Sequence, residues 1–351
     1  MRVPLEIHAN LRNVRRLFRG PGTAEETACE TEILCPEETA ELSSAIFLHG
    51  QLDKITGTSA ETNVPAQVNA LTRVKVTHAA TIAYHIRNAV LLDGSIYSGR
   101  WKSFLSDTPP HFSKCAPIHL ETAALASTTA GTKYFGHWLK DDCLQYLLAE
   151  TYCQPLSVKK NRDTPHTIQY ERYFSQDWTP TDRARIDHLI VFQDYAQNSL
   201  KRRRHLLLNS KIRSQLSRST SPPLVYLRRG KTGTERLIQN EDELHDALSK
   251  QGFEVVDVSS DDLEYVIASL MNAKIVVSIE GSHISHCWFS PESASGLITL
   301  QPPDRFTAIH RGWVECMSAR FGVVVGDKAA AGTYFSPSDV LKTVDLMASK
   351  T

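Results

Sequence analysis

The segment EGSHISH at residues 280–286 places a carboxylate, a glycine and two histidines directly after the apolar run KIVVSI. Carboxylate and imidazole groups are common zinc ligands and also common acids and bases in catalysis. A glycine followed by small polar residues suits a third chemistry, because it lets backbone amides approach a phosphate. Three kinds of site therefore compete here: a metal site, an acid/base site and a phosphate cradle.

The phosphate cradle would depend on a helix that begins near Ser282 and points its amides at a negative group. Gly281 would let that group come close to the backbone, and Ser285 lies one turn further along. Glu280 would act as a base or accept hydrogen bonds from ligand hydroxyls, and its structural alternative is to cap the helix.

A zinc site would use His283 and His286. A third strong ligand at recognisable spacing is missing from the sequence, so we expect no resident metal. A zinc-dependent hydrolase that uses these two histidines and a remote carboxylate stays as an alternative.

Arginines end the earlier apolar run LVYLRR, at Arg228 and Arg229, and Arg236 follows the loop GKTGTE. Guanidinium groups recognise phosphate oxygens in a bidentate manner, which suits a diphosphate. Successive residues of a strand point to opposite faces, so one arginine of the pair would face the ligand. Ordinary surface ion pairs are the alternative.

The segment FGHWLKDD in the first half of the chain contains His137 and Asp141. If the segment is helical, these residues are four apart and face the same side. The carboxylate would then orient an imidazole that acts as a general base. The alternative is a histidine that only packs against its aromatic neighbours.

The second half of the chain has the pattern that would position the first two candidates. Five apolar segments (LVYLRR, FEVVDV, KIVVSI, GLITLQ and FGVVVGD) alternate with helical segments, which is typical of a parallel sheet covered on both faces. Asn240 followed by Glu243 predicts a capping box. Ligands of such sheets bind beyond the carboxyl ends of the strands, where Arg228 and Gly281 lie.

The first half has a less regular pattern. Residues 44–99 alternate short apolar runs with turn residues, which predicts short strands, some of them antiparallel. Helices are expected from Thr132 and within 181–216, the latter with a strand at its start. The segment SRSTSPP at 217–223 is the expected linker. The basic run KRRRH at 201–205 is expected to be a solvated helix face.

Composition limits the class of protein. A chain of 351 residues suits two domains, and 39 basic against 39 acidic residues give no overall field that would attract nucleic acid. The seven cysteines are spread along the chain without a CxxC pair, which indicates reduced thiols in a cytoplasmic protein. No run approaches the roughly 20 apolar residues needed to cross a bilayer.

The N-terminal segment has Ile7, Leu11, Val14 and Phe18 at helical spacing, with arginines between them. We expect a helix that packs on its own domain and leaves a basic face in solvent. Peripheral contact with the inner face of a membrane is the alternative, since basic amphipathic helices bind anionic lipid.

Taken together, the motifs HWLxD, a strand ending in arginine, RxxxNxxEL and a later Gly-Ser step resemble glycosyltransferase family 61. The similarity is continuous over about residues 222–325 and patchy over 115–221. It departs from the family at Glu280, where histidine is common, at His283, where glycine is common, and at His286, where asparagine is common. The residues that match the motifs are His137, Asp141, Arg228, Arg236, Asn240, Glu243, Gly281 and Ser282.

The resemblance implies an α/β protein of GT-B type, with two Rossmann-like domains facing a central cleft. Residues 1–220 would form an acceptor-side domain whose first 45 residues are partly irregular. Residues 221–351 would bind the nucleotide-sugar, and the last helix would pack back on the N-terminal domain.

The resemblance also implies inverting, metal-independent transfer from a nucleotide-sugar, with a UDP-sugar as the expected donor, to a glycan or lipid-linked glycan in polysaccharide biosynthesis. No separate cofactor is expected. His137, assisted by Asp141, would be the base, with Glu280 in reserve. A nucleotide- or glycan-binding module without turnover is the non-enzymatic alternative. The expected donor-binding residues are Arg228, Arg236, Asn240, Gly281, Ser282, His283 and Ser285.

Overall fold

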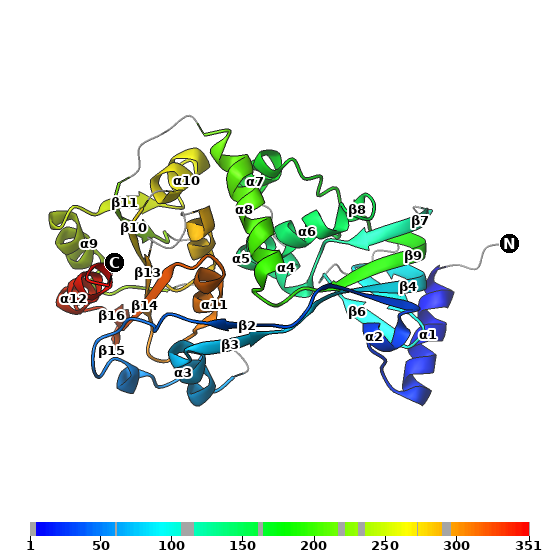
Figure 1. The fold of residues 1–351 in the computed structure, drawn as a ribbon, viewed down its shortest axis with the longest axis horizontal. Helices are drawn as coiled ribbons and strands as arrows, with labels where there is room; N and C mark the ends of the chain where they lie inside the picture. Colours follow the sequence, from blue (N-terminus) through cyan, green and yellow to red (C-terminus); the bar gives the residue numbers. More distant parts are fainter. Residues whose placement is uncertain are drawn as a thin grey trace. The chain divides into compact units, whose positions relative to one another are not determined.

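The chain forms two compact units in a computed structural model (Figure 1). The N-terminal unit comprises Met1–Glu38 and Ala79–Ile212, and the C-terminal unit comprises Thr39–His78 and Arg213–Thr351. The sequence-based division at residue 220 therefore differs from the structure in the placement of residues 39–78. The residues that the structure describes are 5–59, 62–106, 116–160, 164–216, 222–230, 236–271, 273–289 and 296–350.

The C-terminal unit contains a fully parallel sheet in the order β11-β10-β12-β13-β14. Its strands are the five segments predicted from the sequence. The strand order reverses between β10 and β12, and this reversal is the point at which doubly wound sheets bind ligands. The bounds are β10 (Leu224–Arg228), β11 (Glu254–Asp257), β12 (Ile275–Ile279), β13 (Gly296–Gln301) and β14 (Arg320–Val325).

Helices cover both faces of this sheet because its strands are apolar on both sides. On one face, α9 (Glu241–Lys250) and α12 (Pro337–Ala348) pack on a core that includes Tyr226 and Met347. On the other face, α10 (Leu263–Met271), η3 (Ser282–Phe289) and α11 (Ile309–Cys316) pack around Leu227 and Ile284. A small hairpin, β15 (Asp327–Ala329) and β16 (Gly332–Tyr334), precedes α12.

The last helix, α12, for which packing on the N-terminal domain was expected, packs on the core of the C-terminal unit. Its buried Val344 and Met347 belong to the core of the C-terminal unit. Arg320 in β14 also donates to the carbonyl oxygen of Met347 at 2.7 Å.

Residues 39–78 belong to the C-terminal unit because they complete its core. Ile55 and Leu71 are buried in the same cluster as Leu227. Arg311, which is 1% exposed, donates to the carbonyl oxygens of Ser43, Ala70 and Arg73 at 3.0, 3.2 and 2.6 Å. The elements of this segment are β2 (Glu38–Glu41), η1 (Leu52–Lys54), α3 (Val64–Thr72) and β3 (Lys75–His78).

The N-terminal unit is built on a mixed sheet in the order β6-β5-β4-β9-β7-β8, with β1 also paired to β4. The expected second Rossmann-like sheet is thus wrong here: β4, β5 and β6 are antiparallel, and only β7, β8 and β9 pair in parallel. Asp93 and Gly94 both have positive φ and form the tight turn that makes β4 and β5 antiparallel. The bounds are β1 (Glu30–Cys35), β4 (Thr81–Leu92), β5 (Ser95–Ser98), β6 (Trp101–Phe104), β7 (Ile118–Leu125), β8 (Pro155–Leu156) and β9 (Arg183–Gln193).

The helix expected from Thr132 is interrupted. It consists of α4 (Thr129–Lys133), α5 (Phe135–His137), the π-helical turn η2 (Trp138–Asp142) and α6 (Cys143–Ala149). A π-turn of this kind is rare and occurs often at functional sites.

The expectation of a solvated basic face at 201–205 is wrong. In α8 (Ser199–Arg213), Lys201, Arg204 and His205 are buried. They continue the helical spacing of the buried Leu208 and Ile212, so they lie on the face that packs inward. The other helices of this unit are α2 (Ala24–Thr27) and α7 (Pro165–Phe174).

The N-terminal helix α1 (Leu5–Arg19) packs through a different face from the predicted one. Leu5 and Ala9 are buried beside Val90, Leu92 and Tyr97. Arg12 donates to the carbonyl oxygen of Tyr97 at 2.7 Å. By contrast, three of the four side chains that were expected to pack inward are exposed, namely Ile7, Leu11 and Val14, and the side chain of Phe18 lies outside the described part of the structure.

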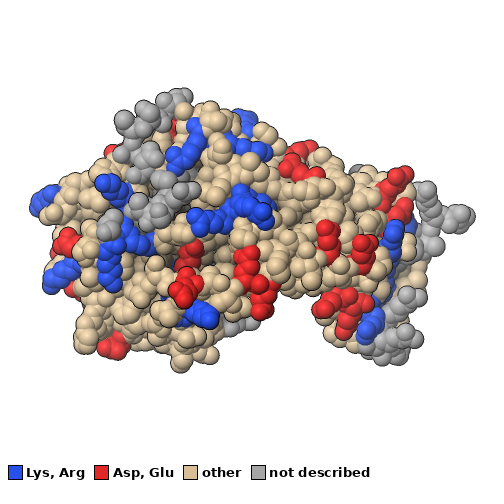
Figure 2. Space-filling view, in the orientation of Figure 1, with Lys and Arg blue, Asp and Glu red and all other residues tan. Residues whose placement is uncertain are grey.

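Three composition-based expectations can be compared with the structure. The face of the molecule in Figure 2 carries acidic and basic side chains in mixed order, as the equal charges suggest. The six cysteines within the described ranges are free thiols. Within those ranges, none of the helices combines the length and apolarity that a bilayer span requires. Residues 217–221 of the predicted linker at 217–223 lie outside the residues that the structure describes.

Candidate functional site

The turn after β12 requires glycine at position 281. Gly281 has φ of +152°, and a Cβ at this position would overlap the guanidinium group of Arg229. That Cβ would also lie 3.1 Å from Nδ1 of His283. The predicted helix begins at Ser282, as the 3-10 helix η3. The glycine thus allows an arginine and a histidine to approach the backbone at the carboxyl end of β12.

Three arginines converge on the residue before this glycine. Arg229 donates to the backbone oxygen of Glu280 at 3.3 Å, and Nε of Arg236 lies 2.7 Å from Glu280 Oε2. Nε of Arg305 lies 3.8 Å from the same oxygen. Among these four side chains, which we call the arginine cluster, positive charge exceeds negative charge.

The electrostatics of Arg229 confirm that the members of the arginine cluster are close enough to interact. Burial lowers the pKa of Arg229, and the charges of Arg236 and Arg305 lower it further, while Glu280 opposes them. A guanidinium group keeps its proton at any ordinary pH, so the arginines repel one another at an energetic cost. An anionic ligand would relieve that cost.

Arg228 lies on the opposite face of β10. It forms two hydrogen bonds with the carboxylate of Glu241 in α9, both at 3.1 Å, and these raise its pKa. Its Nε is also 4.0 Å from Asp257. The alternation of a strand therefore separates the two arginines, and Arg229 is the one beside Gly281.

Glu280 and Asn240 have structural partners. The Glu280 carboxylate is buried and accepts from Arg236, so it links the arginines to the turn. The predicted capping box at Asn240 is wrong, because its side chain bonds no helix amide. Instead Asn240 donates to the carbonyl oxygen of Phe335 at 2.9 Å and accepts from the amide of Phe335 at 3.0 Å.

His283 is held as one neutral tautomer. It is 6% exposed, and burial followed by the charge of Arg229 lowers its pKa well below the ordinary value. Ser278 Oγ donates its one proton to the carbonyl oxygen of Leu227 at 2.7 Å, so it accepts from Nε2 of His283 at 2.8 Å. Nδ1 is then the acceptor of the ring, and it is buried without a hydrogen-bond partner.

His286 and Ser285 are buried within η3. Ser285 Oγ has no hydrogen-bond partner. Across the described part of the chain, no three His, Cys, Asp or Glu side chains are grouped so that they could hold a metal ion. The zinc alternative therefore finds no ligand set among these residues.

The N-terminal unit contains the predicted histidine–carboxylate pair. His137 Nδ1 lies 2.8 Å from Asp141 Oδ2, and both side chains are partly exposed. Burial opposes ionisation of Asp141, but Lys140, Lys201 and the hydrogen bond from His137 outweigh it and hold its pKa well below the ordinary value. Asp141 is thus an anion that can orient the imidazole, and such an orientation suits a general base.

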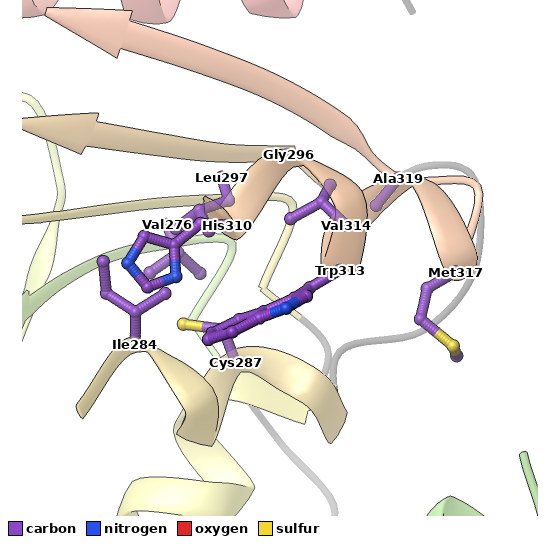
Figure 3. Close-up of a pocket in the computed structure, with 10 residues that line it drawn as sticks. All are labelled: Val276, Ile284, Cys287, Gly296, Leu297, His310, Trp313, Val314, Met317 and Ala319. Carbon is purple, nitrogen blue, oxygen red and sulfur yellow. The ribbon is translucent and has the colours of Figure 1, made fainter. Parts of the chain in front are cut away.

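A small apolar cavity in the C-terminal unit is a different feature. It has a volume of about 40 Å³ and is lined by ten residues from β12, η3, β13, α11 and the segment before β14 (Figure 3). His310 and Cys287 are its polar groups, and the described lining contains no arginine or carboxylate. This cavity does not suit a phosphate group.

Two residues that sequence reasoning missed complete these sites. Arg305 follows β13, and its contact with Glu280 could not be predicted because only the tertiary structure brings the two residues together. Lys201 Nζ donates to Asp141 Oδ1 at 3.0 Å. A signal for Lys201 existed in the sequence, since it continues the helical spacing of Leu208 and Ile212.

The fold and the two sites define a class: an α/β protein with an arginine-rich strand end and a histidine–carboxylate pair. Residues 135–297 match the model of the protein family described as Glycosyltransferase 61. That region contains His137, Arg229 and Gly281, and it is the part of the chain that is similar to family 61 glycosyltransferases. A comparison with curated proteins found no match.

Two solved structures show a weak likeness. One is the iron-containing dodecameric glycosyltransferase TibC from enterotoxigenic E. coli H10407, at 10% identity over 73% of this chain and 82% of that chain, with a TM-score of 0.32. The other is the dodecameric iron-containing heptosyltransferase TibC in complex with ADP-D-beta-D-heptose, at 10% identity, 65% and 78% coverage and a TM-score of 0.29.

Proposed function

We propose that this glycosyltransferase moves a sugar from a nucleoside diphosphate sugar, with UDP as the expected nucleotide, to a hydroxyl group of a glycan in polysaccharide biosynthesis. The observation that carries the proposal is the arginine cluster around Gly281, at the point where the strand order of the parallel sheet reverses. Guanidinium groups and the amides at the start of η3 are suited to a diphosphate.

The reaction would be a direct displacement at the anomeric carbon. Nε2 of His137 accepts the proton of the acceptor hydroxyl while its oxygen forms a bond to that carbon. The bond between the carbon and the diphosphate oxygen breaks, and its electron pair leaves with the nucleoside diphosphate. One in-line displacement inverts the anomeric configuration. The arginine cluster stabilises the negative charge that develops on the leaving group, which is the role a metal ion has in other transferases.

His283 would recognise an uncharged part of the donor. Its Nδ1 is an acceptor beside Gly281 and close to Arg229, so it suits a hydroxyl group of the ribose or the sugar. A buried acceptor rejects ligands that cannot donate to it, because the group would be left unsatisfied. This assigns His283 to donor selection.

A thermal-shift panel of UDP, GDP, ADP, TDP and CMP, each with EDTA or with Mg²⁺, tests the proposal. We expect at least one nucleoside diphosphate to raise the melting temperature equally in both conditions, since a ligand at 100 times its Kd adds about 2.7 kcal/mol of stability. The shift should be lost in Arg229→Met. A panel without any shift would contradict the proposal, and a shift only with Mg²⁺ would contradict metal independence.

A further inference from the structure

Lys201 lies directly behind the histidine–carboxylate pair. It is 0% exposed, and its Nζ donates to Asp141 Oδ1 at 3.0 Å and to the backbone oxygen of Asp194 at 2.7 Å. Its backbone amide donates to the side chain of Asn198 at 3.0 Å, which fixes this residue at the start of α8. A buried ammonium group in such a fixed position needs a carboxylate partner.

Asp141 is the carboxylate that Lys201 neutralises. The other nearby carboxylate, Asp194, already accepts two hydrogen bonds from Arg204, at 2.8 and 2.7 Å, and lies 4.0 Å from Lys201 Nζ. Arg204 also donates to the carbonyl oxygen of Leu144 at 3.0 Å, which ties the network to α6. The Arg204–Asp194 pair thus leaves the charge of Lys201 directed at Asp141.

The two oxygens of Asp141 have different partners. Oδ1 accepts from Lys201, and Oδ2 accepts from Nδ1 of His137 at 2.8 Å. Because an ionised carboxylate can only accept, Nδ1 must carry the proton, and Nε2 of the neutral ring is then the basic nitrogen. A protonated Asp141 would instead donate to Nδ1, and the ring proton would move to Nε2.

We propose that Lys201 is a positioning residue that sets the tautomer of His137 by keeping Asp141 ionised. The catalytic consequence rests on the proposed function, but the tautomer does not. Lys140 also holds the pKa of Asp141 down, so the loss of the Lys201 charge shifts Asp141 toward its protonated form, in which Nε2 of His137 carries the ring proton and cannot accept another.

Lys140 contributes to the same effect: its Nζ lies 3.5 Å from Oδ2, and its charge lowers the pKa of Asp141 together with that of Lys201. Asp142 is a carboxyl group whose pKa burial raises well above its ordinary value. His205 is buried, and burial together with Lys201 lowers its pKa well below the ordinary value, so it is neutral. Lys201 is the cation on the Oδ1 side.

The test is ¹⁵N NMR of histidine-labelled full-length protein at a pH where the His137 ring is neutral, with its signals assigned from the His137→Gln variant. We expect a protonated Nδ1 and a bare Nε2 in the wild type and the reverse in Lys201→Met. Lys211→Met is the matched control, because Lys211 lies on the same helix and donates to the carbonyl oxygen of Phe174 instead. It should keep the wild-type tautomer.

Two further variants keep the test decisive if Lys201→Met does not fold. Lys201→Gln keeps hydrogen-bond donors but removes the charge, and it should show the reversed tautomer. Lys201→Arg keeps the charge and should show the wild-type tautomer. A wild-type tautomer in a folded neutral variant would overturn the proposal.

Once a donor is known, the rate of sugar transfer provides a second test of the role of Lys201. We expect Lys201→Gln to lower the rate by about 10³-fold with little change in donor binding, because the wrong tautomer cannot accept the proton. The double variant Lys201→Gln/Asp141→Asn should lose little more than either single variant, since the residues act as one unit. Independent, additive losses would contradict the proposal. A failed nucleotide panel would count against the proposed function alone, because the NMR reading needs no donor.

Discussion

At the scale of single residues, the side of a strand decides which arginine meets the ligand. Arg228 and Arg229 are neighbours in sequence, but Arg228 is paired with Glu241 in α9, whereas Arg229 lies against the backbone of Glu280 and Gly281. Tyr226 and Leu227 divide in the same way between the two cores of the unit. The alternation of residues along the strand therefore separates the two arginines, but it does not show which of them lies beside Gly281.

The first prediction compares these two arginines. Arg229→Met should weaken binding of the nucleoside diphosphate by about 10- to 100-fold, because a hydrogen bond to a charged group contributes about 1.5–3 kcal/mol. Arg228→Met removes the same side chain one residue away and should have a smaller effect. Calorimetric titration measures both. Equal losses, or a larger loss in Arg228→Met, would place the donor on the α9 side of β10.

The second prediction concerns Gly281→Ala. The added methyl group would displace Arg229 and force a backbone conformation that alanine disfavours. We expect the free energy of unfolding to fall by about 1–3 kcal/mol and nucleotide binding to weaken.

Gly252→Ala is the matched control for that variant. Gly252 ends α9 with φ of +83°, and a Cβ there meets nothing within 4 Å. It should lose about 1 kcal/mol of stability and bind nucleotide normally. Urea unfolding and titration check both variants, and normal binding by Gly281→Ala would show that Arg229 does not need its present position.

Sequence reasoning predicts part of these sites for a clear physical reason. His137 and Asp141 are one helical turn apart, and Gly281 ends an obvious strand, so local periodicity places all three. Arg305 reaches Glu280 only through tertiary structure. The helical spacing of Lys201 indicates that it is buried, but no local pattern identifies Asp141 as its partner.

At the scale of elements, residues 39–78 show how a distant segment becomes part of a unit. The short helix α3 and the segment around Ile55 bury their apolar residues in the core of the parallel sheet. The carbonyl oxygens at the ends of this segment are bonded by Arg311. The hydrogen bonds between Arg311 and this segment were not predictable, because no sequence pattern indicates that an arginine in α11 would be buried.

The third prediction concerns this arginine. Arg311→Lys keeps the positive charge beside Glu315 but cannot donate to three carbonyl oxygens in the geometry of a guanidinium group. We expect amide hydrogens in residues 39–78 to exchange faster while those of β12 and β13 stay protected.

Arg320→Lys is its control, because Arg320 binds the carbonyl oxygen of Met347 in α12 rather than this segment. Hydrogen exchange read by mass spectrometry separates the regions. Unchanged exchange in residues 39–78 of Arg311→Lys would mean that apolar packing alone holds the segment.

At the scale of the whole molecule, the regularity of the C-terminal half made its fold predictable. All five predicted strands are present and parallel, because each is apolar on both faces and separated by a helix. The N-terminal unit was less predictable. Its sheet mixes antiparallel and parallel strands, and the expected parallel architecture rested on the family resemblance rather than on its own sequence pattern.

The equal numbers of acidic and basic residues have a consequence for binding. With 39 of each, the molecule as a whole has no excess charge that would attract a nucleotide over long distances. Affinity for a diphosphate must come from local groups, and the arginine cluster is the place where the described residues gather them.

The most direct test measures release of nucleoside diphosphate from a panel of nucleotide-sugars in the presence of glycan acceptors, with the wild type, His137→Gln and Arg229→Met. The proposed mechanism predicts release by the wild type for one donor. His137→Gln should bind that donor normally but release product about 10²–10⁴ times more slowly, and Arg229→Met should bind it poorly. Release by His137→Gln at the wild-type rate would contradict the assignment of His137 as the base.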